Sequence, residues 1–278
     1  NAAKLRGIVV HKISLPQITA IFLNLRNAPM EAKRVRQALL AATDKYRIAT
    51  EALDSETVIH GQIIPGEIGH DQNLPEPEFD PSRARELLDA EGWKLGSGGD
   101  DRKKGDKTLE ISLATADRPE YIAAAELVKT VWEDVGVKTE LNIVPAGAIK
   151  GETLKPRSFD ALLYGVIVGG DPDPYPFWHS SQADDPGLNL SGFRNRDADR
   201  LMEEARSATT TEVRADRYKK FQGIIAETIP AIFLANPHYS YLVSSKIRGI
   251  NLLRITNPAS RFAQVTEWHR KTKRIWKQ

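Results

Sequence analysis

An alternation of element types near the middle of the chain most limits what it can fold into. Residues 109–115 predict a strand, residues 119–135 an amphipathic helix, and residues 137–144 a second strand. Residues 159–168 form a more continuous apolar run, which is typical of a strand covered on both faces. Strands that alternate with helices pack as a sheet between helical layers, so the sequence predicts an α/β fold.

Further elements are expected on both sides of this unit. Residues 18–25 predict a buried strand, and residues 31–46 predict one helix with Arg36 on its polar face. Residues 81–91 predict a short helix that Asp80 caps and Gly92 ends. Residues 96–107 contain no apolar side chain and predict an exposed hairpin or loop. Helices are also expected at 197–208 and 211–228, and β-rich pieces at 231–235, 239–243, 246–255 and 262–268.

The composition excludes several classes of function. The 278 residues carry 39 basic and 37 acidic side chains, so no overall field favours nucleic acid, and no nucleic-acid partner is expected. We interpret the basic run at 269–277 as a solvated tail. The chain has no cysteine, which removes disulfides and thiolate chemistry. No apolar stretch approaches the ~20 residues that cross a bilayer, so no membrane insertion is expected in this segment.

Motifs of known enzyme and metal sites are not found in the sequence. It contains no P-loop, no dinucleotide-binding glycine pattern and no GxSxG. The six histidines lack the spacing that places two ligands on one helix face. Asp171 and Asp173 begin like a calcium loop, but Pro176 stands where that loop needs glycine. We therefore expect no catalytic residue, no metal site and no cofactor.

The segment GGDPDPYPFWHSSQ, residues 169–182, directly follows the apolar strand at 159–168. Its three prolines restrict the backbone, and open α/β sheets place ligand loops after the carboxyl ends of strands. One interpretation is a binding loop; the other is that the aromatic rings pack the loop onto its own domain while the aspartates cap turns. The candidate ligand-binding residues are Asp171, Asp173, Tyr175, Phe177 and Trp178.

Three stretches together resemble a known family. They are APMEAKRVRQALLAATDK within 24–45, FDPSRARELLDAEGW at 79–93, and DPDPYPFWHSSQ followed by NLSGFRNRDADRLMEEAR. Their order is similar to that in extracytoplasmic solute-binding proteins of family 5, the peptide- and nickel-binding proteins of ABC importers. The resemblance implies one lobe of a type II, periplasmic-binding-protein-like receptor, with a mixed sheet flanked by helices. It also implies a periplasmic or extracytoplasmic location, with the signal sequence outside this segment.

The same resemblance implies a division of the chain. Residues 25–245 are expected to form the distal ligand-binding lobe. Residues 1–24 are expected to be a remnant of the first lobe, and residues 246–278 a segment that returns to it. The N-terminal portion of the receptor is expected to lie outside this sequence.

The function implied is capture of a peptide or related small solute in an interlobe cleft and delivery to the transmembrane subunits of an ABC permease. Asp171 is the position that best matches the family's acceptor for a ligand ammonium. The family's spacing places that acid where Gly170 stands, so an oligosaccharide stacking on Trp178 stays an alternative. A ligand-sensing module of a regulator is a second alternative, and a hydrolase on an α/β scaffold is a third.

Overall fold

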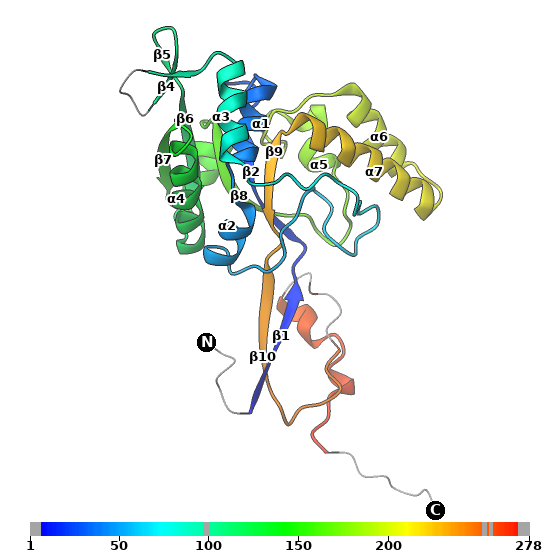
Figure 1. Cartoon of the computed structure of the whole chain (residues 1–278). Helices are drawn as coiled ribbons and strands as arrows, with labels where there is room; N and C mark the ends of the chain where they lie inside the picture. Colours follow the sequence, from blue (N-terminus) through cyan, green and yellow to red (C-terminus); the bar gives the residue numbers. More distant parts are fainter. Residues whose placement is uncertain (1–6, 97–100, 252–254, 256–257, 272–278) are drawn as a thin grey trace, which may run out of the picture.

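A five-stranded sheet organises most of the chain in the computed structural model, which describes residues 7–96, 101–251, 255 and 258–271 (Figure 1). The strand order is β7-β6-β8-β2-β9. Strand β6 pairs parallel with β7 and β8, whereas β2 pairs antiparallel with β8 and β9. The sheet is therefore mixed, and the predicted α/β class is confirmed. The strands span Gln17–Leu23 (β2), Glu110–Ala116 (β6), Lys138–Val144 (β7), Ala161–Ile167 (β8) and Ala231–Ala235 (β9).

Helices flank this sheet in two groups. Helix α4 packs against β6, β7 and β8, while α2 packs against β9 and α4. Helices α5, α6 and α7 lie together on the other side of the body, to the right in Figure 1. The helices span Lys33–Ala41 (α1), Lys45–Glu51 (α2), Pro81–Ala90 (α3), Pro119–Glu133 (α4), Tyr175–Trp178 (α5), Arg196–Arg206 (α6) and Thr211–Thr228 (α7). Within the described residues, no helix is long and apolar enough to span a bilayer.

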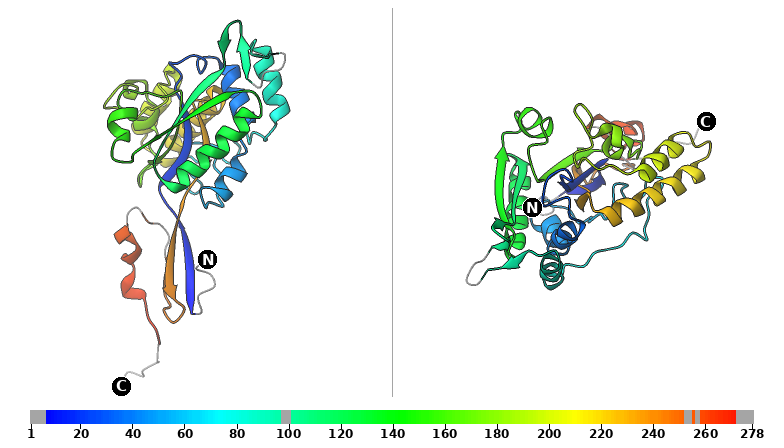
Figure 2. Two further views of the ribbon diagram at one scale, coloured as in Figure 1. Left: turned by 90° about the vertical axis from the view of Figure 1, so that its left-hand side faces the viewer. Right: turned by 90° about the horizontal axis from the view of Figure 1, so that it is seen from above.

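A two-stranded antiparallel ribbon extends from the body, as Figure 2 shows. It pairs β1, Ile8–Ser14, with β10, His238–Ser244. Strand β1 was not among the elements that the sequence predicts. Beside the ribbon, the β-rich piece predicted at 262–268 is wrong, because this stretch forms two 3₁₀ turns, η4 (Pro258–Phe262) and η5 (Val265–Glu267).

The position of β2 changes the predicted division of the chain. Its backbone pairs with β8 on one side and β9 on the other, so residues 17–23 are an inner strand of the five-stranded sheet. At the other end, β10 belongs to the ribbon, although it was expected within 25–245. The body therefore runs from about Leu15 to about Pro237, since these residues stand just before β2 and just after β9 and are joined by a backbone hydrogen bond of 3.0 Å. Which lobe each part represents stays a prediction.

The helix predicted at 31–46 is two helices. Helix α1 ends at Ala41, and the Asp44 carboxylate accepts a hydrogen bond from the Arg47 backbone N–H at 3.0 Å, which starts α2 anew. Arg36 is buried rather than solvent-facing. Its guanidinium donates to the Thr228 carbonyl at 2.8 and 3.0 Å and so satisfies the end of α7. Arg36, which the sequence pattern places on a polar face, thus caps the C-terminus of α7.

The boundary signals of α3 are confirmed. The Asp80 carboxylate accepts from the Arg83 N–H at 2.8 Å, and Gly92 has φ +91°. The predicted hairpin follows as β3 (Lys94–Leu95), β4 (Arg102–Lys104) and β5 (Lys107–Thr108), with residues 97–100 outside the described part. Within it Arg102 is buried, because its guanidinium donates to Asp89 and to the Val135 carbonyl. Most of the basic run at 269–277 also lies outside the described residues.

Candidate functional site

Four strands, β6, β7, β8 and β9, end at the edge of the sheet that faces the ribbon. Gln17, at the start of β2, lies opposite Ile167 at the end of β8. Strand β6 runs parallel to β8, and β9 ends with Ala235 opposite Thr19. Because β2 begins directly after β1, the loops that leave β6, β8 and β9 gather on the ribbon side of the body. This is the edge where open α/β sheets hold ligands.

The segment at 169–182 leaves β8 at this edge and is more ordered than a loop. Gly169 turns with φ +79°, a left-handed conformation that favours glycine. Residues Tyr175–Trp178 form the single turn α5, and Ser180–Gln182 form a 3₁₀ turn. The Asp173 carboxylate accepts from the Tyr175 N–H at 3.1 Å and so fixes the start of α5.

Two of the five predicted site residues are part of the core. Trp178 is 0% exposed, and its ring lies about 6 Å, centroid to centroid, from those of Phe22 and Phe233. Its Nε1 donates to the Gln62 side-chain oxygen at 2.8 Å. Phe177 is 9% exposed. The interpretation that an oligosaccharide stacks on Trp178 is not supported, because no face of this ring reaches solvent; these two aromatics pack the segment onto the body instead.

The two aspartates differ in accessibility. Asp171 Oδ1 lies 2.5 Å from Arg214 Nη2, and its side chain is 60% exposed. Asp173 Oδ2 lies 2.7 Å from Arg206 Nη2, and its side chain is 19% exposed. The Arg206 guanidinium also covers the Tyr175 ring at 3.8 Å from the centroid. Asp173 and Tyr175 are therefore held by internal partners, while Asp171 keeps most of its carboxylate open to solvent. Contact of either acid with a ligand stays a prediction.

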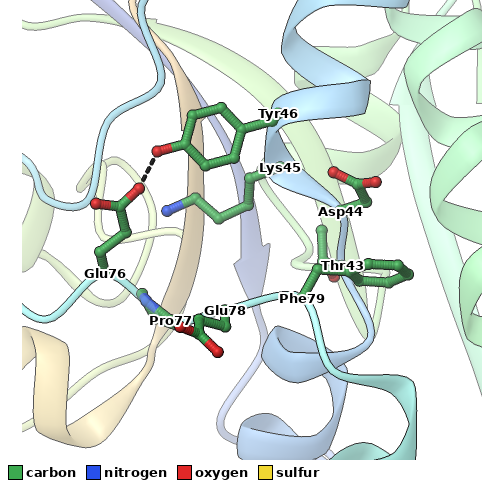
Figure 3. A pocket seen from close by; sticks show the side chains of 8 residues that line it. All are labelled: Thr43, Asp44, Lys45, Tyr46, Glu76, Pro77, Glu78 and Phe79. Atoms are coloured by element: carbon green, nitrogen blue, oxygen red, sulfur yellow. Dashed lines mark hydrogen bonds between the residues drawn. The ribbon is translucent and has the colours of Figure 1, made fainter.

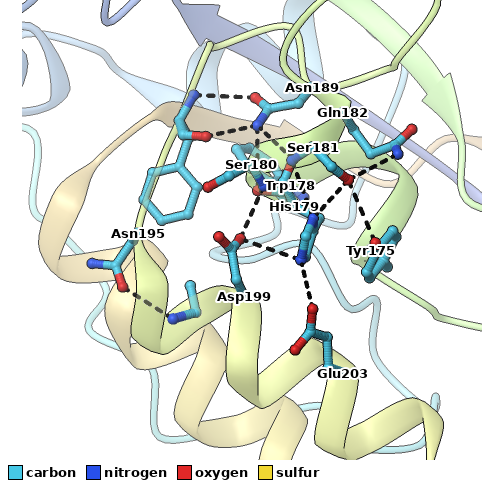
Figure 4. A network of polar contacts seen from close by, with 12 residues as sticks. Tyr175, Trp178, His179, Ser180, Ser181, Gln182, Asn189, Asn195, Asp199 and Glu203 are labelled. Atoms are coloured by element: carbon cyan, nitrogen blue, oxygen red, sulfur yellow. Dashed lines mark hydrogen bonds and ion pairs between the residues drawn. The ribbon is translucent and has the colours of Figure 1, made fainter.

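His179 joins this segment to α6 through a network that Figure 4 shows. Its ring stacks on Tyr175 at 4.0 Å, and its Nδ1 accepts from the Ser181 N–H at 3.1 Å. Since Nδ1 accepts, Nε2 carries the hydrogen, which points to Glu203 at 3.3 Å. Asp199, one turn away on α6, accepts from the Ser180 N–H at 2.9 Å. The sequence analysis missed this network; the one available signal was the i, i+4 pair of acids on α6.

A second group at the same edge was also missed. A cavity of ≈ 350 Å³ opens beside the start of β2 and the first turn of α4, with Gln17, Arg118 and Tyr121 in its lining. A Cβ on Gly165 would lie 2.2 Å from the Tyr121 hydroxyl oxygen, so only glycine permits this approach. Burial raises the pKa of Tyr121. Arg118 lies over the Tyr121 ring at 5.5 Å and pairs with Glu120 at 2.9 Å.

The edge thus offers hydrogen-bonding and charged groups but no metal cluster. Across the described ranges, no group of three or more histidine, aspartate or glutamate side chains has the arrangement to hold a metal ion. The polar groups at this edge include the carboxylate of Asp171, the guanidinium of Arg118 and the amide of Gln17.

Comparison with a family model places the chain among known proteins. Residues 2–187 match the model described as "Bacterial extracellular solute-binding proteins, family 5 Middle". Among curated relatives, the oligopeptide-binding protein AppA of Bacillus subtilis is 28% identical over 234 residues, which cover 81% of this chain and 42% of AppA. Heme-binding protein A of Haemophilus influenzae is 27% identical over 236 residues, covering 84% of this chain and 41% of the relative.

Solved structures show the same likeness. AppA from Bacillus subtilis in complex with a nonapeptide superposes with a TM-score of 0.79 at 25% identity, covering 97% of this chain and 53% of that one. NikZ from Campylobacter jejuni in complex with Ni(L-His) has a TM-score of 0.80 at 23% identity, covering 96% and 54%. At that identity NikZ shows the fold alone. The chain therefore spans about half the length of these proteins, or less.

Proposed function

Because the chain belongs to the bacterial extracellular solute-binding proteins of family 5, we propose that it is one ligand-binding lobe of the substrate-binding component of an ABC importer. The observation that carries this proposal is the family match over residues 2–187. It is supported by the gathering of strand ends and polar side chains at the ribbon edge. Solute is held at this edge against a second lobe in the rest of the protein, and the closed receptor delivers it to the permease.

The ribbon supports this two-lobed arrangement. Strands β1 and β10 pair along their whole lengths, so the chain enters and leaves the body at one place. Two adjacent crossings form a hinge more readily than two distant ones, because both backbones bend about a common line. In this proposal the body, from about Leu15 to about Pro237, is the distal lobe, and the segments after Ser244 and before Ile8 belong to the other lobe.

The proposed solute is a peptide or a related small molecule with an ammonium group. Asp171 follows β8 at this edge, and its side chain is 60% exposed. A carboxylate that accepts from an ammonium in a closed cleft contributes about 1.5 to 3 kcal/mol. Arg214 holds Asp171 in place through a 2.5 Å contact, so the ligand shares the carboxylate with this arginine.

The test is titration calorimetry on the complete protein with peptides, free and N-acetylated. Asp171→Ala is expected to weaken binding of the free peptides by about tenfold or more and to leave acetylated ones unchanged. Asp216→Ala is the matched control, since Asp216 is also a partly exposed aspartate paired with basic side chains. Unchanged affinity in Asp171→Ala removes Asp171 from the site, and absence of any peptide binding removes the peptide proposal.

A further inference from the structure

Lys45 is a buried lysine without a carboxylate partner. It occupies the first turn of α2 and is 5% exposed. Its Nζ lies 2.8 Å from His60 Nδ1, which is an uncharged acceptor. Among the residues that the structure describes, Lys45 forms no ion pair, whereas Lys12 and Lys138 each pair with a glutamate. Buried lysines normally have an anionic partner, so this amine is an exception.

The acidic groups around Lys45 have other partners. Glu76 accepts a hydrogen bond from the Tyr46 hydroxyl (Figure 3). It also lies 3.8 Å from His60 Nε2. Asp44 caps α2 through the Arg47 N–H. Glu78 lines a cavity that Lys45 also lines. The carboxylates thus surround the amine without contacting it.

The electrostatics of this arrangement favour a neutral amine. Burial lowers the pKa of Lys45 to about 8, against an opposing effect of the Glu76 charge. Burial, with the charges of Lys45 and His70 added, lowers the pKa of His60 to about 4. At pH 8 about half of the Lys45 amines are unprotonated, compared with well under about one in a hundred for an ordinary lysine. His60 stays neutral at that pH and continues to accept from Nζ.

A cavity gives small molecules access to this amine. It has a volume of ≈ 460 Å³ and lies between α2 and the segment at 76–79, with Lys45 along one wall in Figure 3. A second hollow of ≈ 40 Å³, lined by Lys45, His60 and Phe233, lies behind it. The first volume is that of a small-ligand pocket. Aromatic rings and Pro77 in its lining favour a ligand with an apolar portion. The lining carboxylates of Glu76 and Glu78 disfavour anionic ligands.

The geometry points to Lys45 as a nucleophile that binds a small uncharged aldehyde in this cavity as an imine. The unprotonated Nζ attacks the carbonyl carbon, a C–N bond forms, and the carbonyl electron pair moves to oxygen, which takes a proton. The carbinolamine is complete once nitrogen has given up one proton in place of the one that oxygen took. The second amine proton then passes to the hydroxyl group as the C–O bond breaks and water leaves. The net change is aldehyde plus amine to imine plus water, with no oxidation or reduction.

This site is independent of the proposed solute cleft. None of its lining residues lies in the segment at 169–182 or in the cavity beside Tyr121. A lysine that is buried only for packing would be shielded and would react more slowly than an exposed lysine. Relative reactivity therefore separates the two roles.

The test is reductive labelling of the full chain with propionaldehyde and cyanoborohydride between pH 6 and 10, with site occupancy measured by peptide mass spectrometry. At pH 8 we expect Lys45 to be labelled about tenfold more than Lys12 and Lys138, because their glutamate partners raise the pKa of both. The pH profile at Lys45 should have its midpoint near the pKa of about 8. Labelling of Lys45 equal to or below that of the paired lysines overturns the proposal.

Two variants test whether Lys45 is the labelled residue and whether Glu76 raises its pKa. Lys45→Arg should remove the label at this position while leaving Lys12 and Lys138 unchanged. Glu76→Gln removes the nearby negative charge that raises the pKa of Lys45, so the labelling midpoint should move to lower pH. A midpoint that stays the same or rises in Glu76→Gln contradicts the arrangement described.

Discussion

The segment at 169–182 and the cavity around Lys45 both place charged groups beside aromatic rings, and they satisfy those charges in opposite ways. In the segment, Asp171 and Asp173 pair with Arg214 and Arg206 at 2.5 and 2.7 Å. In the cavity, the amine of Lys45 meets only an imidazole at 2.8 Å. In the segment, ion pairs with arginines hold the carboxylates in place. In the cavity, the protonated amine of Lys45 has no ion pair among the described residues, so its burial is costly.

The difference shows that conspicuous carboxylates in a sequence do not locate reactivity. The segment at 169–182 carries two aspartates directly after a strand, yet Asp173 and His179 are held by partners within the fold. Lys45 stands in an ordinary helical stretch, yet burial changes its pKa to about 8. Stability should therefore respond to substitutions in the segment, and pH dependence to substitutions in the cavity. Three substitutions test this contrast.

The largest effect is expected from Trp178→Ala. The ring is fully buried against Phe22 and Phe233, so its removal leaves a cavity and should lower the free energy of unfolding by about 3 to 5 kcal/mol. Urea denaturation measures it. Trp178→Phe is the matched control: it keeps a ring but leaves the Gln62 oxygen without its donor, at a cost of about 1 to 3 kcal/mol. A loss below about 1 kcal/mol in Trp178→Ala would mean that the segment is not anchored by this ring.

Lys45→Met should raise the free energy of unfolding, by less than Trp178→Ala lowers it. The folded pKa of Lys45, about 8, lies below its ordinary value of 10.5, so between these pH values the unfolded chain binds more protons. Stability of the natural protein therefore rises through this window, and at pH 7 the buried charge costs roughly 3 kcal/mol. Lys45→Met removes that cost and loses the hydrogen bond to His60, so we expect a gain of about 2 kcal/mol at pH 7.

Urea denaturation of both proteins at pH 7 and pH 10 measures the difference. The gain should shrink toward pH 10, where the natural protein has released the proton from Lys45. Lys12 and Lys138, with raised pKa values, are present in both proteins and cancel in the comparison. A gain that is the same at both pH values would show that Lys45 is protonated throughout.

Elements with strong local signals were predicted well. The strand–helix–strand unit appears as β6, α4 and β7. It was predictable because the side chains that face the core set the spacing of apolar residues in the sequence. Helix α3 begins at Asp80 and ends before Gly92 because capping depends on adjacent residues. The break between α1 and α2 was missed because Asp44 is compatible with both a helix interior and a cap, and the fold selects the cap.

The site depended on contacts between distant residues, which one sequence does not specify. Burial of Trp178 follows from Phe22 and Phe233, which lie far from it in the chain and near it only in the folded sheet. The sequence allowed this ring either to bind a ligand or to pack onto its own domain. In the fold it packs onto the domain. Likewise, nothing in the sequence joins Lys45 to His60, because the shift in pKa comes from burial rather than from neighbours in the chain.

The smallest effect on stability is expected from Asp171→Ala. The carboxylate is 60% exposed, so its pair with Arg214 should contribute less than about 0.5 kcal/mol. Asp173→Ala is the matched comparison and should cost about 1 kcal/mol, because the Asp173 side chain is mostly buried and its carboxylate also accepts from the Tyr175 N–H. Peptide affinity should be affected more by Asp171→Ala than by Asp173→Ala. A loss of about tenfold, or about 1.4 kcal/mol, is expected only for Asp171→Ala. Equal losses of stability in the two variants would mean that Asp171 also serves the fold, and its exposure would then no longer set it apart as the ligand contact.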